Sequence, residues 1–449
     1  MFGFCRWSIC FNRFQRQDRR RGAVCIHAAA PEYISDDIRF GRKVSLMSKK
    51  IPLYAVIIVA IIAVVVTFNA SFLFFEQKYN TKLNETLSGY SYFDKLLSVD
   101  EIVRKYYIGE IDDDALNAAV IRGYLSGIGD NYSMYMTSDE YDAFKNEQNG
   151  NAVGIGVNVI YDTGNESIEI ISILPDSPAA ESGLLEGDII TGVEGQRISE
   201  IGYYAALDLI KGDKGTQVEL SVRRGSEETT VICERREVKT LSVTYHVYGG
   251  SGDVGFIRIS EFNSTTPEQF KNAIEELRSS GCTKFVFDLR NNGGGELNSI
   301  VEVLDYLLPE GPIAHIYYNT GEEDHYKSDA SFLDAKVAVL TNSRTASAAE
   351  LFTCALKDYT EHGDYDAVLV GTTTYGKGVL QRFFTLKDGS AFKISTGRYN
   401  PPYSENYDGI GITPDIEIEL SEEASSINFY KLTDENDNQL IAAVKALNQ

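Results

Sequence analysis

A run of 25 residues without a charged side chain constrains this chain more than any other feature. It covers residues 51–75 and consists mostly of aliphatic and aromatic residues. At a rise of about 1.5 Å per residue, a helix of this length crosses a bilayer core of about 30 Å. Two lysines precede the run and a glutamate follows it. Because positive charge favours the cytoplasmic side, we expect one transmembrane helix with the following body outside.

A cleaved signal peptide is the alternative interpretation of this run. Signal sequences have apolar segments of about 7–15 residues that end at a cleavage site of small residues. The present run is longer, although Asn69-Ala70-Ser71 keeps a cleavage site open. We favour the anchor, which predicts a single-pass protein of the cell membrane with an extracytoplasmic body.

The charges are distributed unevenly along the chain. Residues 1–50 carry 11 Lys/Arg and 4 Asp/Glu, whereas residues 51–449 carry 31 Lys/Arg and 61 Asp/Glu. We therefore expect a basic cytosolic tail over 1–50 and an acidic body. Such a body repels the phosphate backbone, which excludes nucleic acid as a partner.

The spacing of apolar residues divides the body into four segments. Residues 76–150 have mostly helical spacing, which predicts an N-terminal helical region. Residues 151–240 contain the alternating apolar and polar runs of half-buried strands. Residues 241–420 alternate apolar strands with helical stretches, which predicts an α/β layer structure. Residues 421–449 form an acidic C-terminal tail that we expect to end in a helix.

The segment 151–240 resembles a PDZ domain. Its string SPAAESGLLEGDIITGVEGQ matches the core of that family almost position by position. The resemblance implies a groove that adds a peptide to a sheet edge and captures the terminal carboxylate with backbone N–H groups. It places this nest at Gly154-Ile155-Gly156-Val157, where glycines allow close approach. A plain hairpin turn is the alternative interpretation of these glycines.

Three stretches of the segment 241–420 contain residues suited to acyl transfer. Three glycines, 293–295, follow an apolar strand and precede a helical run, where N–H groups can hold an oxyanion. Ser347 stands among small residues between a strand and a helix, as an accessible nucleophile requires. Lys377 lies between two glycines, and burial beside the serine would lower its pKa toward that of a base. Taken singly, these features are a turn, an N-cap serine and a surface lysine.

Together the three stretches resemble the C-terminal processing peptidases, also called tail-specific proteases, over roughly residues 85–420. The resemblance implies an α/β protease core with crotonase-like ββα layers and an inserted PDZ domain. The family's S-A-S-A-S-E string corresponds to T-A-S-A-A-E here, which implies Ser347 as the nucleophile. Its G-K-G turn implies Lys377 as the base, and the position four residues later implies Gln381 as the residue that orients the lysine.

The same resemblance assigns supporting positions. The N–H groups of Ala348 and of Gly294 or Gly295 are implied as the oxyanion hole, and Asp358 as a structural support. The family's NNPGG turn is NNGGG in this chain, so a proline has become Gly293. The family's G-x-G-x-x-P-D and G-D-N-Y-S strings are present at 409–415 and 129–133.

The implied activity is a membrane-anchored serine endopeptidase that cleaves proteins near their C-termini. The implied partners are proteins or peptides with free C-terminal tails, which the PDZ domain recognises or gates, and a homodimer is one assembly that we allow. We expect no metal and no cofactor, since the chain has no HExxH string. The alternative is an inactive PDZ scaffold that binds protein C-termini, and the joint presence of Ser347, Lys377 and Gln381 favours the enzyme.

Overall fold

The computed structural model describes residues 52–87, 91–162 and 164–449. The chain forms two units, Met1–Gly109 and Glu110–Gln449. The basic tail predicted over 1–50 lies outside the described residues.

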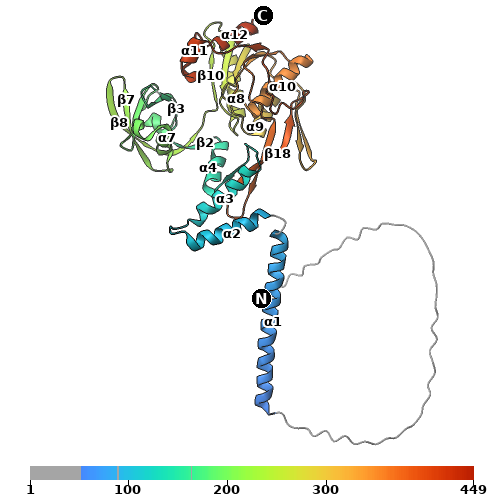
Figure 1. Cartoon of the computed structure of the whole chain (residues 1–449). Coiled ribbons are helices and arrows are strands. Elements are labelled where there is room, and N and C mark those ends of the chain that lie inside the picture. Colours follow the sequence, from blue (N-terminus) through green and yellow to red (C-terminus); the bar gives the residue numbers. More distant parts are fainter. Residues whose placement is uncertain (1–51, 88–90, 163) are drawn as a thin grey trace, which may run out of the picture. The chain divides into compact units, whose positions relative to one another are not determined.

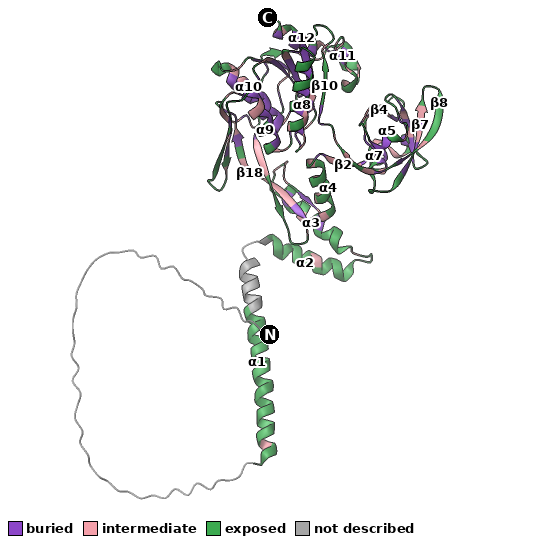
Figure 2. Ribbon diagram, turned by 180° about the vertical axis from the view of Figure 1, so that it is seen from behind, coloured by how far each residue is buried: buried purple, intermediate pink, exposed green. Residues whose placement is uncertain are grey.

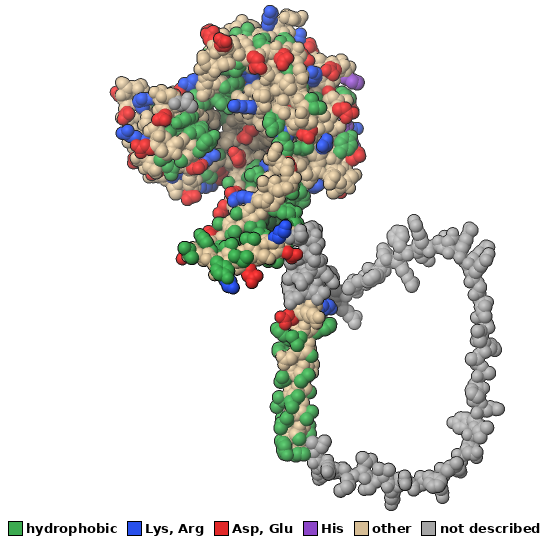
Figure 3. Space-filling view, viewed as in Figure 1, with side chains coloured by type: hydrophobic (Ala, Val, Ile, Leu, Met, Phe, Trp, Pro, Cys, Tyr) green, Lys and Arg blue, Asp and Glu red, His purple; other side chains and the backbone are tan. Residues whose placement is uncertain are grey.

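The first unit contains helices α1 (Leu53–Leu87) and α2 (Ser91–Tyr106). Residues Leu53–Lys78 of α1 form a span of 26 residues with a mean hydropathy of 2.7. Figure 2 shows the described part of α1 to be exposed, and Figure 3 shows hydrophobic side chains along it. The span is long and apolar enough to cross a membrane. Length and composition alone support the transmembrane helix, which stays a prediction.

The second unit begins with helices α3 (Asp113–Gly127) and α4 (Ser138–Gln148), in the region predicted to be helical. Between them lies a short strand that the helical spacing did not reveal, β1 (Met134–Met136). It pairs with β18 (Ala391–Asn400), with Tyr135 opposite Phe392. This pairing ties the N-terminal segment to the C-terminal half of the unit.

The PDZ segment folds around a sheet with the strand order β3-β4-β5-β7-β8 and with β6 on β5. Strands β2 (Asn151–Gly154) and β9 (Arg236–Lys239) pair with each other, so the two ends of the segment lie side by side, as an inserted domain requires. Buried Ile168, Ile190 and Leu220 belong to its core. Its other elements are β3 (Val157–Asp162), β4 (Ser167–Ile173), α5 (Pro178–Glu181), β5 (Ile189–Val193), β6 (Gln196–Arg197), α6 (Ile198–Ile201), α7 (Tyr203–Lys211), β7 (Gln217–Arg224) and β8 (Glu227–Glu234).

The α/β segment contains a six-stranded sheet in the order β10-β11-β12-β15-β16-β19. Within this sheet β11, β12, β15, β16 and β19 are parallel, and β10 is antiparallel to β11. Its central strands are mostly apolar because both faces are covered. The elements are β10 (Val243–Val247), β11 (Val254–Ile259), α8 (Thr266–Ser279), β12 (Lys284–Asp288), α9 (Leu297–Leu307), β15 (Lys336–Thr341), α10 (Ala348–His362), β16 (Ala367–Gly371) and β19 (Ile416–Glu417) (Figure 1).

A second, antiparallel sheet joins distant parts of the unit. Its order is β1-β18-β13-β14, and β17 also pairs with β18. Its remaining strands are β13 (Gly311–Tyr318), β14 (Glu323–Ser328) and β17 (Val379–Thr385). The crotonase-like arrangement of layers stays a prediction.

The C-terminal segment ends in a helix, α12 (Asn438–Leu447), but it is not a separate tail. Helix α12 packs Leu440, Val444 and Leu447 against the face of the six-stranded sheet that carries Val286. The predicted boundary at residue 420 therefore divides a single core, because the apolar spacing of α12 belongs to a buried helix face. Before it lie α11 (Glu422–Ser426) and the 3₁₀ turn η1 (Phe429–Lys431).

Candidate active site

Ser347 lies at the start of α10 in a strained backbone conformation. The chain leaves β15 at Thr341 and enters α10 at Ala348, and Ser347 has φ 59° and ψ −119°. A positive φ is uncommon for a residue with a side chain, and such strain gathers at functional sites. Gly294 makes room for this turn, because a Cβ there would lie 2.7 Å from Ser347 Cβ. The Oγ of Ser347 accepts a hydrogen bond from the Tyr399 hydroxyl at 3.3 Å.

The buried carboxylate of Glu350 joins the serine turn to the lysine turn. Its Oε2 accepts the N–H groups of Ser347 and Lys377, both at 2.8 Å. Its Oε1 accepts the Gly376 N–H at 2.5 Å and the Thr374 hydroxyl at 2.6 Å. The side chain has no solvent exposure, so these four hydrogen bonds replace its water shell and fix its position.

Lys377 lies between two glycines, and the loop that contains Asn406 and Gly411 packs against both of them. Gly376 has φ 89°, and a Cβ there would lie 2.9 Å from the N of Gly411. A Cβ at Gly378 would lie 2.7 Å from the amide of Asn406. The G-x-G-x-x-P-D string therefore packs on the lysine turn, which leaves no room for larger residues beside Lys377.

The amine of Lys377 has a lowered pKa. Burial lowers the pKa of its amine, and the neighbouring charge of Lys393 lowers it further. The Nζ lies 4.6 Å from the centre of the Tyr132 ring. Among the described residues, no hydrogen bond joins this Nζ to Ser347 Oγ. Lys377 and Ser347 line the same cavity, and the lysine amine lies over the ring of Tyr132.

The structure corrects one predicted oxyanion donor. The N–H of Gly294 donates to Asn292 Oδ1 at 2.8 Å, so it is already engaged. The N–H groups of Ala348 and Gly295 have no acceptor within the part of the chain that the structure describes. These two N–H groups are the predicted donors that the local structure leaves free for an oxyanion.

A buried ion network holds the start of the glycine turn. Arg290 Nη2 donates to Asp288 Oδ2 at 2.8 Å and to Asp437 Oδ2 at 2.6 Å. Arg258 Nη2 reaches the same oxygen of Asp288 at 2.9 Å. Burial works to raise the pKa of Asp288, but Arg290 and Arg258 outweigh it and lower this pKa to about 2. The C-terminal segment thereby anchors the residue that precedes Asn291.

Gln381 and Asp358 contact groups other than the proposed pair. The Nε2 of Gln381 donates to Val379 O at 3.0 Å, and within the described residues no hydrogen bond joins Gln381 to Lys377. Asp358 Oδ2 accepts two backbone N–H groups of residues 403–404, at 2.8 and 2.9 Å. Asp358 therefore braces a loop, and the orienting role implied for Gln381 stays a prediction.

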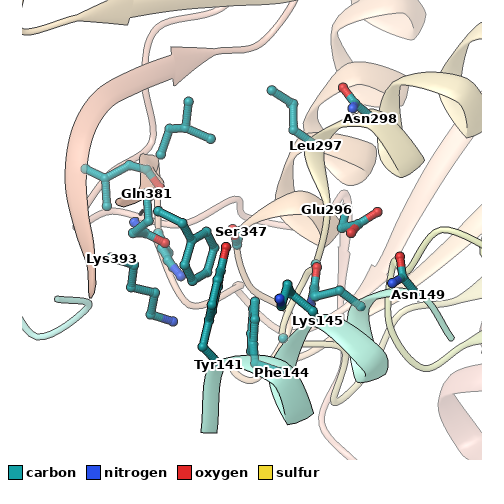
Figure 4. A pocket seen from close by; sticks show the side chains of 17 residues that line it. Tyr141, Phe144, Lys145, Asn149, Glu296, Leu297, Asn298, Ser347, Gln381 and Lys393 are labelled. Atoms are coloured by element: carbon teal, nitrogen blue, oxygen red, sulfur yellow. Dashed lines mark hydrogen bonds between the residues drawn. The ribbon is translucent and has the colours of Figure 1, made fainter. Parts of the chain in front are cut away.

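One cavity of about 620 Å³ brings the site residues together. Figure 4 shows Ser347 at its centre, Gln381 and Lys393 along one side, and Glu296 and Asn298 on the opposite side. Helix α4 closes it with Tyr141, Phe144 and Lys145. The other lining residues are Gln148, Asn149, Gly293, Gly295, Leu297, Lys377, Val379, Leu380 and Phe383.

The predicted carboxylate nest is a loop between strands of different sheets. Strand β2 pairs with β9 whereas β3 pairs with β4, so the hairpin alternative is wrong. Gly156 has φ 81°, and a Cβ there would collide with the side chain of Ser177. The N–H groups of Ile155 and Gly156 have no acceptor among the described residues. A loop with free N–H groups at a sheet end has the form that carboxylate capture requires.

Three residues of this site were missed from the sequence. Glu350 gave a signal, since it is a lone acid in an otherwise apolar helix start, AAELFTCAL. Tyr399 and Lys393 gave none, because Tyr399 reaches Ser347, and Lys393 lines the cavity, from β18, a strand of the other sheet.

Comparisons with known proteins agree with the motifs. The model of peptidase family S41 matches residues 253–418, and a PDZ domain model matches residues 169–224. A probable CtpA-like serine protease of Staphylococcus aureus (strain COL) is 33% identical over 368 residues, which cover 81% of this chain and 71% of the relative.

A solved structure of a similar protein shares the fold. A putative S41 protease from Bacteroides fragilis NCTC 9343 is 19% identical, with a TM-score of 0.52 over 73% of this chain and 90% of that chain. A photosystem II D1 C-terminal processing protease is 28% identical, with a TM-score of 0.43 over 72% of this chain and 86% of that chain.

Proposed function

The chain belongs to peptidase family S41 and is a serine peptidase, and from this premise we propose that Ser347 is its nucleophile and Lys377 its base. The observation that carries the proposal is the shared cavity, which Ser347, Lys377 and Gly295 all line. The lowered pKa of Lys377 supports it, because a base must lose its proton near the working pH. Glu350 adds support by fixing both turns with one carboxylate.

Acylation begins when the neutral amine of Lys377 takes the proton of Ser347 Oγ. The amine must first move away from the ring of Tyr132. Substrate binding commonly shortens the hydrogen bond between a base and its nucleophile, which here would join Lys377 to Ser347. The Oγ then bonds to the peptide carbonyl carbon, and the N–H groups of Ala348 and Gly295 receive the negative oxygen.

The tetrahedral intermediate collapses when its C–N bond breaks. Lys377 gives the proton to the leaving amine, so that an acyl ester remains on Ser347 and the amine product departs. Lys377, neutral again, takes a proton from a water molecule, whose oxygen attacks the ester. The serine recovers its proton, and the second product leaves as an acid.

We further propose that the enzyme is anchored by α1 and cleaves proteins near their C-termini. The span Leu53–Lys78 supports the anchor by length and composition. The free N–H groups of Ile155 and Gly156 support capture of a terminal carboxylate by the PDZ domain. The orientation with the protease outside follows from the lysines before the helix.

The test uses the full chain in detergent micelles with an unfolded protein as substrate. Ser347→Ala should abolish cleavage yet still bind a peptide with a free C-terminus. Ser343→Ala is the matched control, because this exposed serine lies four residues earlier in the same loop and should cleave normally. Cleavage by Ser347→Ala at the wild-type rate would contradict the assignment.

A further inference from the structure

Lys393 is a second lysine beside the proposed base. It lies on β18, opposite Met134 of β1 and Phe383 of β17. Its side chain lines the same cavity as Ser347 and Lys377. Figure 4 shows it on the side of Gln381, with its amine extending toward the aromatic wall of helix α4.

Lys393 has no carboxylate in ion-pair contact among the described residues. Within the described residues Lys393 forms no ion pair and no hydrogen bond, and its amine lies 5.9 Å from the centre of the Phe144 ring. The charge of Asp130 acts on Lys393 without a hydrogen bond between them. The carboxylate of Asp130 accepts hydrogen bonds from the hydroxyl of Ser133 at 2.5 Å and from the N–H of Tyr132 at 3.0 Å. Lys393 therefore keeps its hydrogen-bonding capacity for a group that enters the cavity.

The third lysine on the cavity wall, Lys145, has partners. Lys145 forms an ion pair with Asp142 at 2.7 Å, and about half of its side chain is exposed (49%). Water and a carboxylate thus satisfy Lys145, whereas Lys393 is half-buried in the cavity that Lys377 also lines. A part-buried cation without a partner is unfavourable, and an anion in the cavity removes that cost.

We propose that Lys393 binds a carboxylate of the substrate within the catalytic cavity. This inference rests on the proposed function, because it assumes that the cavity holds the peptide that Ser347 attacks. The carboxylate is either the free C-terminus or an acidic side chain next to the cleaved bond. Both present the same oxygen pair to the amine. Lys393 is thus a specificity-determining residue for substrates with negative charge at the site.

The test measures binding in a Ser347→Ala background, with the full chain in detergent micelles and fluorescent peptides. One peptide, taken from a segment that the wild type cleaves, has a free C-terminus, and its partner has an amide. In a second pair both peptides have an amidated C-terminus. One carries Glu, and the other Gln, at the two positions that flank the cleaved bond. Lys393→Met should reduce the preference for carboxylate over amide about tenfold in at least one pair.

The controls separate this site from the PDZ domain and from bulk charge. Lys145→Met should keep the carboxylate preference, and Lys393→Arg should retain most of it. Any contribution of the PDZ nest is the same in all variants and cancels in the comparison. Thermal unfolding confirms that each variant is folded.

Each outcome decides one question. A lost preference in the first pair identifies the free C-terminus, and one in the second pair identifies an acidic side chain. An unchanged preference in both pairs, or an equal loss in Lys145→Met, overturns the inference. Cleavage by Ser347→Ala would contradict the proposed function instead, and the binding comparison would still report on Lys393.

Discussion

At the scale of the residue, Glu350 links the two halves of the proposed catalytic pair. Glu350→Gln replaces one acceptor oxygen by an NH₂ group that faces N–H donors. We expect kcat to fall about 100-fold, because small displacements of reacting groups have effects of this size. Kinetics of the purified variant test this, together with circular dichroism to confirm folding.

Glu361→Gln is the matched control, since Glu361 is exposed on the same helix. Activity of Glu350→Gln equal to that of this control would show that the carboxylate bridge does not position the pair.

The second prediction concerns the pH dependence of the rate. Activity should rise with pH as the Lys377 amine loses its proton. Burial is the main cause of its lowered pKa, and the charge of Lys393 lowers it further. Lys393→Met removes that charge, so the pKa of Lys377 rises and the rising limb of kcat/KM moves to higher pH.

An amidated substrate without acidic residues keeps substrate charge out of this measurement. Lys145→Met should leave the limb in place, because Lys145 is paired with Asp142. A limb that stays fixed or moves to lower pH in Lys393→Met would contradict the assigned electrostatics.

The resemblance to a family's strings indicated some residues of the candidate site and not others. Ser347 and Lys377 were indicated by strings that, taken singly, also fit an N-cap serine and a surface lysine. The engaged N–H of Gly294 depends on how the Asn292 side chain folds back, which no pattern reports. Lys393 enters the site through strand pairing with β1 and β17, and such long-range pairing is not visible in a local window.

At the scale of the element, the C-terminal segment braces the glycine turn through Asp437. Asp437→Asn leaves Arg290 and Arg258 to share the single buried carboxylate of Asp288, so one positive charge of the network is uncompensated. We expect a loss of about 3–5 kcal/mol in the free energy of unfolding, measured with urea. Activity should fall as well, because Arg290 precedes the turn that lies against Ser347.

Glu435→Gln, an exposed acid two residues earlier, should change the free energy of unfolding by less than about 0.5 kcal/mol. If Asp437→Asn behaves in the same way, the buried network does not hold the turn.

The nest loop of the PDZ domain is the second element with a testable role. Gly156→Ala adds a Cβ that collides with Ser177 and should weaken binding of a free-tail peptide more than tenfold, as measured by fluorescence anisotropy. Gly195→Ala is matched, since Gly195 also has a positive φ, 72°, but has no atom within 4 Å of its Cβ position. Equal binding by the two variants would place peptide capture elsewhere.

The alternation of strands and helices in the α/β segment was readable because buried parallel strands are long apolar runs. The three-residue strand β1 was not, since its existence depends on β18. The spacing of apolar residues in α12 predicts a buried helix face but does not show which part of the protein buries it. That α12 belongs to the core depends on the sheet face that it covers.

At the scale of the whole molecule, the proposed anchor would determine where the peptidase acts. Ile61→Asp combined with Val65→Asp places two charges near the middle of the apolar span Leu53–Lys78, at a cost of about 2.5–3.5 kcal/mol each in a bilayer. The doubly substituted protein should appear in the soluble fraction after alkaline extraction, whereas the wild type should remain in the membrane. A wild-type protein that begins near residue 71 would establish a cleaved signal peptide instead.

Apolar patterns distinguished the PDZ segment from the α/β segment, because half-buried strands alternate apolar and polar residues whereas buried parallel strands are apolar runs. The division into two units at Gly109 was not visible in the sequence, because it depends on tertiary contacts.

The most direct test of the Ser347–Lys377 assignment is to trap the acyl-enzyme. Wild-type protein mixed with an activated peptide ester is quenched in acid and digested with trypsin, and the peptide covering residues 345–357 is sequenced by mass spectrometry. The acyl mass should lie on Ser347 in the wild type and be absent from both Ser347→Ala and Lys377→Met. An acyl group on another residue, or a Lys377→Met variant that acylates at the wild-type rate, would contradict the account.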